Sequence, residues 1–364
     1  MCLYPTWGIN PKYKPNKKNG GNPPKCEDGR LLYVPFKCGK CIECRRQKQR
    51  EWRVRLAEEL KDNFAYFVTL TISDQGLRYL EAKTGMRIEG NPNELATYAV
   101  RLFCERIRAA TGKTMRHWFT TELGENTDRI HLHGLTFGQN SAKLLRKHWT
   151  FGGVFIGTFT NERSINYMTK YMLKVDLKHP TYTPIVLASK GIGSGYLKRN
   201  GGEWQKKNYK KINVPTYTFR NGTKMAMPKY YRDKLFNEQE RETIWLNNLE
   251  RGVEYIGGEP VPADDTQTIE NLRKFYRKKG VTIFHDNPDA WDEAKAHRRM
   301  EKQRKAIAIR KRFASKAATG RQTCADKDIR KLYTEMCRVY NENERKYLAS
   351  VGPRPRRRGG SSGA

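Results

Sequence analysis

The sequence has few acidic residues and no long apolar run. Only 38 of its 364 residues are Asp or Glu against 71 Lys or Arg, so the formal net charge is +33. No stretch approaches the roughly 20 apolar residues of a membrane helix, and no hydrophobic signal segment begins the chain. We therefore expect an intracellular protein without a membrane partner. Its eight cysteines should then be thiols or metal ligands rather than disulfides.

A nucleotide-binding loop of the Walker type is also missing. Gly112-Lys113-Thr114 lacks the required glycine five residues before its Gly-Lys pair, and the glycine-rich stretch at 187–200 has the wrong spacing. These absences exclude a recognisable NTPase or helicase module. The basic charge instead favours nucleic acid, because neutralising phosphates releases counterions. The 19 Tyr and 7 Trp residues could stack on unpaired bases.

Three cysteines, Cys38, Cys41 and Cys44, are separated by two residues each. This spacing lets a tight turn direct several thiolates at one ion, as in structural zinc knuckles. A closed tetrahedral site needs a fourth ligand, which Cys2 or Cys26 could supply. A 4Fe–4S cluster is the alternative occupant, although nothing else in the sequence indicates redox chemistry.

Basic side chains gather in two places that could follow a phosphate backbone. The first half of a predicted helix at 45–63 is crowded with arginine, and the glycine-rich stretch at 187–200 could approach DNA closely. The predicted DNA-contacting residues are Arg45, Arg46, Arg53, Lys190, Lys198 and Arg199. A merely solvated basic face is the other interpretation of the helix.

The hydrophobic pattern predicts an α+β fold. Strands are expected at 64–72, 117–122, 130–137 and 154–159, and helices at 93–110 and 141–149. Another helix, capped by Ser164 or Asn161, should end near residue 179. The order strand, helix, strand, strand, helix, strand is that of a ferredoxin-like antiparallel sheet with flanking helices.

The rest of the chain suggests four parts. We expect a cysteine-rich segment with a basic helix at 1–63, in which 1–37 forms loops, and a core domain at 64–232. A basic helical region should follow at 233–350, with a long helix at 293–313, and a disordered tail at 351–364.

Two histidines, His131 and His133, flank one apolar residue on a predicted strand. Strand side chains alternate between faces, so both imidazoles should lie on the same face and could share a metal ion. Glu122 ends the strand that pairs with this one, and its carboxylate could complete a Glu-His-His triad. Such a triad leaves coordination positions open for a substrate oxygen. The alternative is a partly exposed strand pair without a metal.

A tyrosine–lysine repeat lies on the helix that follows. Tyr167, Lys170, Tyr171 and Lys174 are spaced i, i+3, i+4 and i+7, which places them on one helix face. A tyrosine oxygen could attack a phosphate held by the metal, giving a tyrosyl 5′-phosphate and a free 3′-hydroxyl on DNA. The pKa of tyrosine is about 10, so neighbouring lysine ammonium groups would assist the attack. Core aromatics at helical spacing are the commoner meaning of such a pattern.

These motifs occur in a recognisable order. The strand Phe67-Val-Thr-Leu-Thr71, the His131–His133 pair followed by Gly134, and the Tyr167–Tyr171 pair resemble the ordered motifs of HUH endonucleases. Two tyrosines four residues apart resemble the rolling-circle initiators of small single-stranded DNA phages. Together with Cys2, the cysteine knuckle and Trp52, they are most similar to the gokushovirus-like microvirus initiators, proteins of the gene A type. The resemblance covers roughly residues 1–200.

The resemblance implies a function in more detail. Initiators of this family make an Mg²⁺- or Mn²⁺-dependent nick in the replicative form and rejoin the displaced strand, with the two tyrosines alternating between the steps. It implies origin DNA, and a host helicase and replisome, as partners in the bacterial cytoplasm. It favours Cys2 as the fourth zinc ligand over Cys26. The remaining alternatives are a single-tyrosine HUH transposase, which the paired tyrosines disfavour, and a non-catalytic zinc-containing protein that binds DNA or RNA.

Overall fold

A computed structural model describes residues 1–124, 128–157, 160, 162–173, 178, 182–284, 303–304 and 307–308. The chain forms two compact units, considered separately below. The first comprises Met1–Tyr4, Cys38–Ala263 and Asn271–Ala290, and the second Pro5–Lys37, Asp264–Glu270 and Trp291–Ala364. In the described part of the chain, no helix is long and apolar enough to cross a membrane.

The first unit contains a five-stranded antiparallel sheet. Its strands are β3 (Ala65–Thr71), β4 (Arg116–Leu123), β5 (Ile130–Phe137), β6 (Val154–Ile156) and β7 (Val186–Ala188). They lie in the order β6-β3-β5-β4-β7, so the predicted histidine strand β5 is central. The prediction of a mixed α/β protein with an antiparallel sheet is therefore confirmed.

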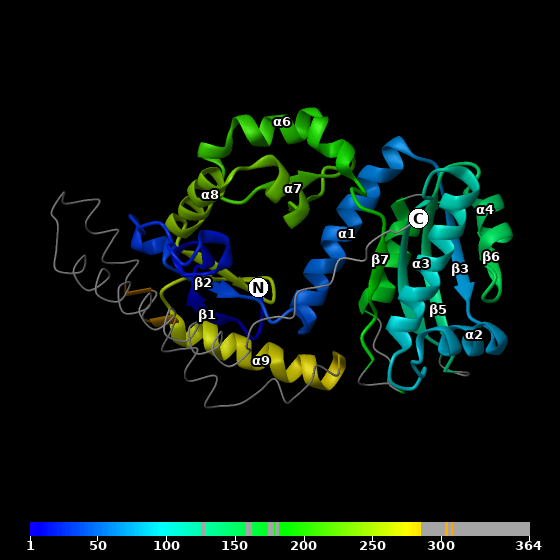
Figure 1. Cartoon of the computed structure of the whole chain (residues 1–364). Helices are drawn as coiled ribbons and strands as arrows, with labels where there is room; N and C mark the ends of the chain where they lie inside the picture. The colour runs from blue at the N-terminus through cyan, green and yellow to red at the C-terminus, as the bar shows by residue number, and fades with distance from the viewer. Residues whose placement is uncertain are drawn as a thin grey trace, which may run out of the picture. The chain divides into compact units, whose positions relative to one another are not determined.

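Each face of this sheet has its own helices. Leu70, Leu132 and their neighbours pack against the helices α2 (Asp74–Thr84), α3 (Pro92–Thr111) and α4 (Ser141–His148). On the opposite face, Trp118 and Leu135 pack against α1 (Ile42–Asp62) and α5 (Glu162–Lys170). Figure 1 shows α1 beside the sheet, away from α2, α3 and α4. The alternation of β5 thus places one set of side chains toward α3 and the other, including the histidines, toward α5.

Gly134 follows the histidine pair because β4 and β5 approach closely there. A Cβ atom at Gly134 would lie 2.0 Å from the Trp118 carbonyl oxygen and 2.8 Å from the Phe119 Cα. No side chain fits in this space.

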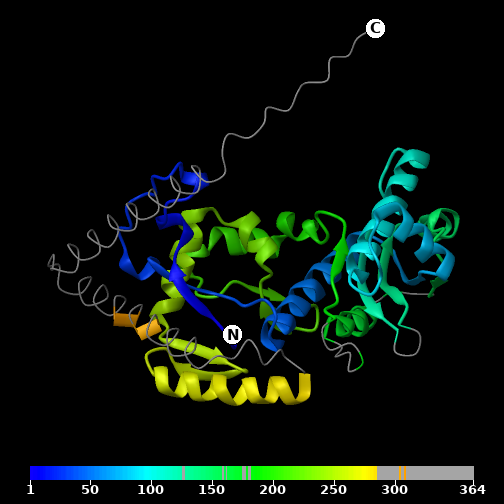
Figure 2. The same ribbon diagram turned by 60° about the horizontal axis from the view of Figure 1, so that its bottom comes forward.

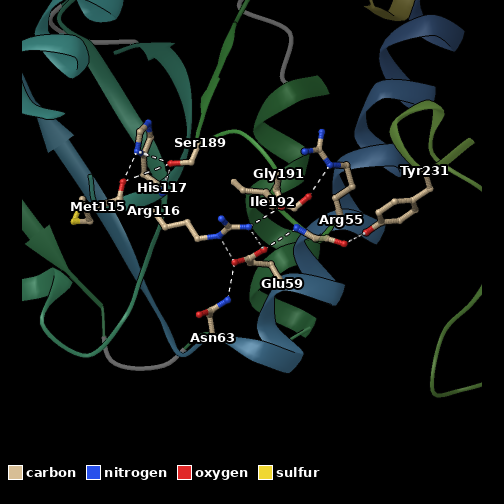
Figure 3. A network of polar contacts seen from close by, with 11 residues as sticks. Arg55, Glu59, Asn63, Met115, Arg116, His117, Ser189, Gly191, Ile192 and Tyr231 are labelled. Carbon is tan, nitrogen blue, oxygen red and sulfur yellow. Dashed lines mark hydrogen bonds and ion pairs between the residues drawn. The ribbon is translucent and has the colours of Figure 1, made fainter. Parts of the chain in front are cut away.

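A polar network ties α1 to the segment after β7 (Figure 3). The Glu59 carboxylate accepts hydrogen bonds from Arg116, from the backbone N–H of Gly193 at 2.6 Å and from Asn63. Tyr231 donates to the Gly193 carbonyl at 2.8 Å. Since Glu59 is 2% exposed, these bonds form out of water and hold the glycine-rich segment in one place.

The remaining elements of the first unit are short. They are the 3₁₀ turns η4 (Tyr171–Leu173), η5 (Ser194–Lys198) and η6 (Tyr209–Lys211), the helices α6 (Asn200–Lys207), α7 (Lys229–Leu235) and α8 (Glu238–Glu250), and the strand pairs β8 (Thr216–Thr218) with β9 (Lys224–Ala226) and β10 (Val253–Ile256) with β11 (Glu259–Pro262). The helix α9 (Thr266–Phe284) runs along the β10–β11 hairpin, as Figure 2 shows, and its Tyr276 hydroxyl donates to Glu259 at 2.7 Å.

The second unit contains an antiparallel pair, β1 (Thr6–Ile9) with β2 (Tyr33–Phe36), and three 3₁₀ turns, η1 (Pro11–Tyr13), η2 (Lys17–Asn19) and η3 (Gly29–Leu31). Asparagine and aspartate side chains cap each of these turns. The prediction that 1–37 consists of loops alone was therefore wrong.

Four other local predictions were also wrong or incomplete. The loop expected before α3 contains α2, and the segment at 187–200 begins inside β7 and contains η5. The region after 233 includes the β10–β11 hairpin besides helices. Ser164 lies within α5 rather than at its start. Asn161, most of the helix expected at 293–313 and the tail at 351–364 lie outside the described residues.

Candidate active site and cysteine cluster

The two histidines lie on one face of β5, as their spacing predicts. In the sheet register His131 pairs with Glu122 and Thr71, and His133 pairs with Thr120 and Thr69. The two imidazole rings are nearly parallel, with centroids 6.3 Å apart.

Glu122 and His133 are in direct contact. The Glu122 Oε2 atom lies 2.7 Å from His133 Nε2, and both side chains are 15% exposed. On the other side of the ring, the Thr69 hydroxyl lies 3.0 Å from Nδ1. A hydroxyl can donate or accept, so Thr69 can satisfy either tautomer of His133. When it accepts from Nδ1–H, the Nε2 lone pair is available to a metal ion.

His131 is half-buried, and burial lowers the pKa of its imidazole despite a hydrogen bond with the Arg129 backbone. Its ring is therefore neutral at neutral pH, the form that can bind a metal. Two imidazoles and one carboxylate form a donor set that suits a divalent cation. The residues Glu122, His131 and His133 thus fit the ion that the sequence predicts.

Both tyrosines face the histidines. Tyr171, the first residue of η4, stacks its ring on His133 with centroids 4.5 Å apart and planes 10° from parallel. Tyr167, on α5, meets the Tyr171 ring edge-on, and the two hydroxyl oxygens lie 2.9 Å apart. Met168 and Met172 point the other way, into the core shared with α1. This packing fixes the helix face on which the tyrosines lie.

The lysines of the repeat are only partly visible. Lys170 ends α5 and is exposed. Lys174 lies outside the described residues.

The four cysteines Cys2, Cys38, Cys41 and Cys44 form a separate cluster. Their sulfur atoms all lie within 4.8 Å of one another, and they could hold a metal ion. Among the described residues, no other set of three or more candidate ligands is this compact. Hydrogen bonding with the thiols of Cys2, Cys41 and Cys44 lowers the pKa of Cys38. Cys26 lies in the second unit, where its thiol donates to the Asp28 carbonyl.

A residue distant in the sequence helps to place Cys2. Arg277 of α9 is 4% exposed and donates from Nε to the Leu3 carbonyl at 2.7 Å. Its guanidinium also lies over the Tyr4 ring, 5.0 Å from the centroid. The sequence gives no indication of this contact, because it joins positions 274 residues apart.

The predicted DNA-contacting residues differ in their surroundings. Lys190 and Lys198 are exposed. Arg46 pairs with Glu43 at 3.0 Å, and Arg199 pairs with the carboxylates of Glu58 and Asp62 at 3.1 and 2.6 Å. Arg53 lies over the Phe219 ring, 5.2 Å from its centroid, and Arg45 is half-buried.

Comparison with known proteins agrees with this arrangement. Residues 65–176, which include both histidines and both tyrosines, match the family model of the replication-associated protein ORF2 type. The matches support a phage rolling-circle replication initiator. Replication-associated protein ORF2 of Spiroplasma virus 4 is 28% identical over 249 residues, which cover 60% of this chain and 73% of that protein. Replication-associated protein VP4 of Bdellovibrio phage phiMH2K is 27% identical over 289 residues, covering 65% and 85%. No solved structure matches.

Thr69 is a residue of this phage-type replication protein that the sequence analysis did not single out. It lies two residues from Thr71 on β3, so both hydroxyls belong to the sheet face of the histidines. Two threonines at this spacing beside a histidine strand are the signal that could have indicated it.

Proposed function

We propose that this protein is an HUH endonuclease that starts rolling-circle replication by nicking origin DNA with a tyrosine. The carrying observation is that Tyr171 stacks on His133 while its hydroxyl lies 2.9 Å from that of Tyr167. The strand order β6-β3-β5-β4 supports a ferredoxin-like core, in which β5 brings its histidines to the centre of the sheet.

The reaction is a transfer of one phosphoryl group. The tyrosine oxygen forms a bond to phosphorus, the bond from phosphorus to the 3′-oxygen breaks, and the proton lost by tyrosine is balanced by one taken up at that oxygen. The products are a 5′-phosphotyrosine link and a 3′-hydroxyl that can prime synthesis. An Mg²⁺ or Mn²⁺ ion held by Glu122, His131 and His133 would supply positive charge to the scissile phosphate.

The paired hydroxyls support a role for both tyrosines. While one oxygen carries negative charge, the other can donate a hydrogen bond to it, and bonds to ionised groups are roughly twice as strong as neutral ones. We assign the same stabilising role to the exposed ammonium of Lys170, and to that of Lys174. After one round of synthesis the second tyrosine would attack the regenerated origin, and the released 3′-hydroxyl would rejoin the displaced strand.

We further propose that the four-cysteine cluster holds a structural Zn²⁺. Four thiolates close a tetrahedral site, which leaves no position for a substrate and suits a structural ion. We place the protein in the bacterial cytoplasm, acting on single-stranded and double-stranded origin DNA with a host helicase and replisome.

The direct test incubates the protein with supercoiled origin DNA and Mg²⁺ or Mn²⁺, and adds SDS before electrophoresis. The wild-type protein should give nicked DNA covalently linked to protein, and His131→Ala should give none. Tyr167→Phe and Tyr171→Phe should each retain one cleavage of a short oligonucleotide, and the double variant should be inert. Tyr79→Phe, which changes an exposed tyrosine on α2, is the matched control and should behave as wild type.

Absence of a linked product from the wild-type protein would refute the endonuclease and favour a non-catalytic DNA- or RNA-binding protein. Cleavage by the double tyrosine variant would mean that the nucleophile lies elsewhere.

A further inference from the structure

An isolated aromatic side chain lies on the edge of the sheet face that carries the histidines. Phe155 of β6 is 62% exposed, the highest value among the exposed large hydrophobic side chains of the described residues. The register pairs Thr69 with Phe155 on one side and with His133 on the other. Directly paired strand residues share a face, so the three side chains form one row. Two strand spacings put Phe155 roughly 10 Å from His133 along the sheet.

The neighbours of Phe155 leave both faces of its ring accessible. On this sheet face the residues before and after it along β6 are Gly153 and Gly157. A Cβ atom at Gly153 would lie 3.1 Å from the Thr71 hydroxyl oxygen, and one at Gly157 would lie 3.1 Å from the Phe67 ring. Val154 and Ile156 point to the opposite face and pack there. The strand is therefore anchored from one side while a single ring stands out on the other.

Edge position adds to this accessibility. β6 is the outermost strand next to β3, so no further strand covers the flank of Phe155 in the described sheet. Exposure of one large apolar side chain is not unusual by itself. Here it coincides with glycines on both sides and with a direct row to His133 and Tyr171.

We propose that Phe155 is a stacking platform for one nucleobase of single-stranded DNA next to the scissile phosphate. This inference rests on the proposed function, since the catalytic histidines and Tyr171 define where that phosphate lies. Every base has a π face, so the subsite accepts any base and positions the strand rather than reading its sequence. The hydroxyls of Thr69 and Thr71 lie along the same face and suit the sugar–phosphate backbone between the base and the metal ligands.

The test measures binding of fluorescein-labelled dT15 by fluorescence anisotropy at about 0.25 M NaCl. Salt at this level weakens the contacts of the many basic residues but leaves stacking largely intact. We expect Phe155→Ala to weaken binding about 5- to 150-fold, the loss of one base–aromatic stack. Phe155→Trp should bind at least as tightly as wild type. Phe155→Leu, which keeps an apolar side chain without a π face, should weaken binding like alanine.

Phe275→Ala is the matched control, because this phenylalanine of α9 is 60% exposed and has no place in the row. It should bind dT15 like wild type. Affinities of Phe155→Ala and Phe155→Leu within twofold of wild type would overturn the subsite, as would an equal loss in Phe275→Ala. Thermal unfolding of each variant identifies loss caused by misfolding, and Phe155→Trp tests the platform independently of truncation.

Nicking assays separate this inference from the proposed function. If wild type nicks DNA and Phe155→Ala nicks equally well at limiting DNA, the subsite fails and the endonuclease stands. If wild type binds dT15 through Phe155 but never nicks, the subsite stands and the endonuclease fails.

Discussion

Single hydroxyl and thiol groups decide how the two candidate metal sites are held. The Thr69 hydroxyl, 3.0 Å from His133 Nδ1, orients a ring whose Nε2 atom faces Glu122. Partners of this kind fix both the tautomer and the direction of a histidine ligand.

We predict that Thr69→Val weakens Mn²⁺ binding about 10- to 100-fold, as is common when a partner of a ligating histidine is lost. Thr69→Ser keeps the hydroxyl and should bind Mn²⁺ nearly as wild type. Thr136→Val, which alters a buried threonine elsewhere on β5, is the control. Isothermal titration with Mn²⁺ measures all three variants. Equal affinities for Thr69→Val and wild type would remove the orienting role.

The cysteine cluster makes a second prediction at this scale. Purified protein should contain about one zinc per chain, because four thiolates complete one tetrahedral site. Cys2→Ser should lower the zinc content or its resistance to chelators. Cys26→Ser is a matched control, since Cys26 belongs to the second unit, where its thiol donates to the Asp28 carbonyl. Elemental analysis after dialysis against EDTA is the measurement, and loss of zinc in Cys26→Ser alone would contradict the assignment.

At the scale of elements, close packing between β4 and β5 positions the histidine strand. Gly134 has no room for a Cβ atom beside the Trp118 carbonyl. The strand pair therefore depends on a glycine immediately after the histidines.

We predict that Gly134→Ala lowers the free energy of unfolding by about 1–3 kcal/mol, the usual cost of inserting a group into a packed site. Gly90→Ala is the matched control, because no atom lies within 4 Å of its Cβ position. It should be neutral or slightly stabilising, since alanine restricts the unfolded chain. Denaturant unfolding followed by circular dichroism compares them. Equal stabilities for the two variants would show that the strands separate without cost.

Periodic elements could be predicted from the sequence, and elements made by tertiary pairing could not. The apolar patterns of β3, β5 and α3 are long enough to indicate their type, and the structure confirms them. The strand β7 has three residues, and it forms because β4 offers it hydrogen-bonding partners. The helix α2 was hidden by Gly76 in its first turn, a poor helix former. That glycine is needed because a Cβ atom would lie 2.0 Å from the Phe151 carbonyl oxygen.

The candidate site divides in the same way. The spacing of His131 and His133, and of Tyr167 and Tyr171, depends on a single strand or helix, so the sequence was enough to group each pair. The contact of Thr69 with His133 and the row to Phe155 depend on strand register, which no local pattern specifies.

Over the whole molecule, the net charge of +33 governs the approach to DNA. Binding should weaken strongly as salt rises, since each neutralised phosphate releases counterions. Individual basic residues will not contribute equally, because several already pair with carboxylates.

We predict that Lys198→Gln reduces the slope of log affinity against log salt by about 0.7 for single-stranded DNA, the value for one phosphate contact. Arg199→Gln should change this slope less, because Glu58 and Asp62 already balance its charge. Titrations at several salt concentrations test the pair. A larger slope change for Arg199→Gln than for Lys198→Gln would contradict this division.

The most direct test of the central claim is to locate the covalent link to DNA by mass spectrometry. Trypsin cleaves after Arg163, Lys170 and Lys174, so Tyr167 and Tyr171 fall in separate peptides, 164–170 and 171–174. After reaction with origin DNA and nuclease digestion, we predict a nucleotide phosphate on one or both of these tyrosines. DNA that is nicked without any adduct, or an adduct confined to other residues, would contradict the tyrosine mechanism.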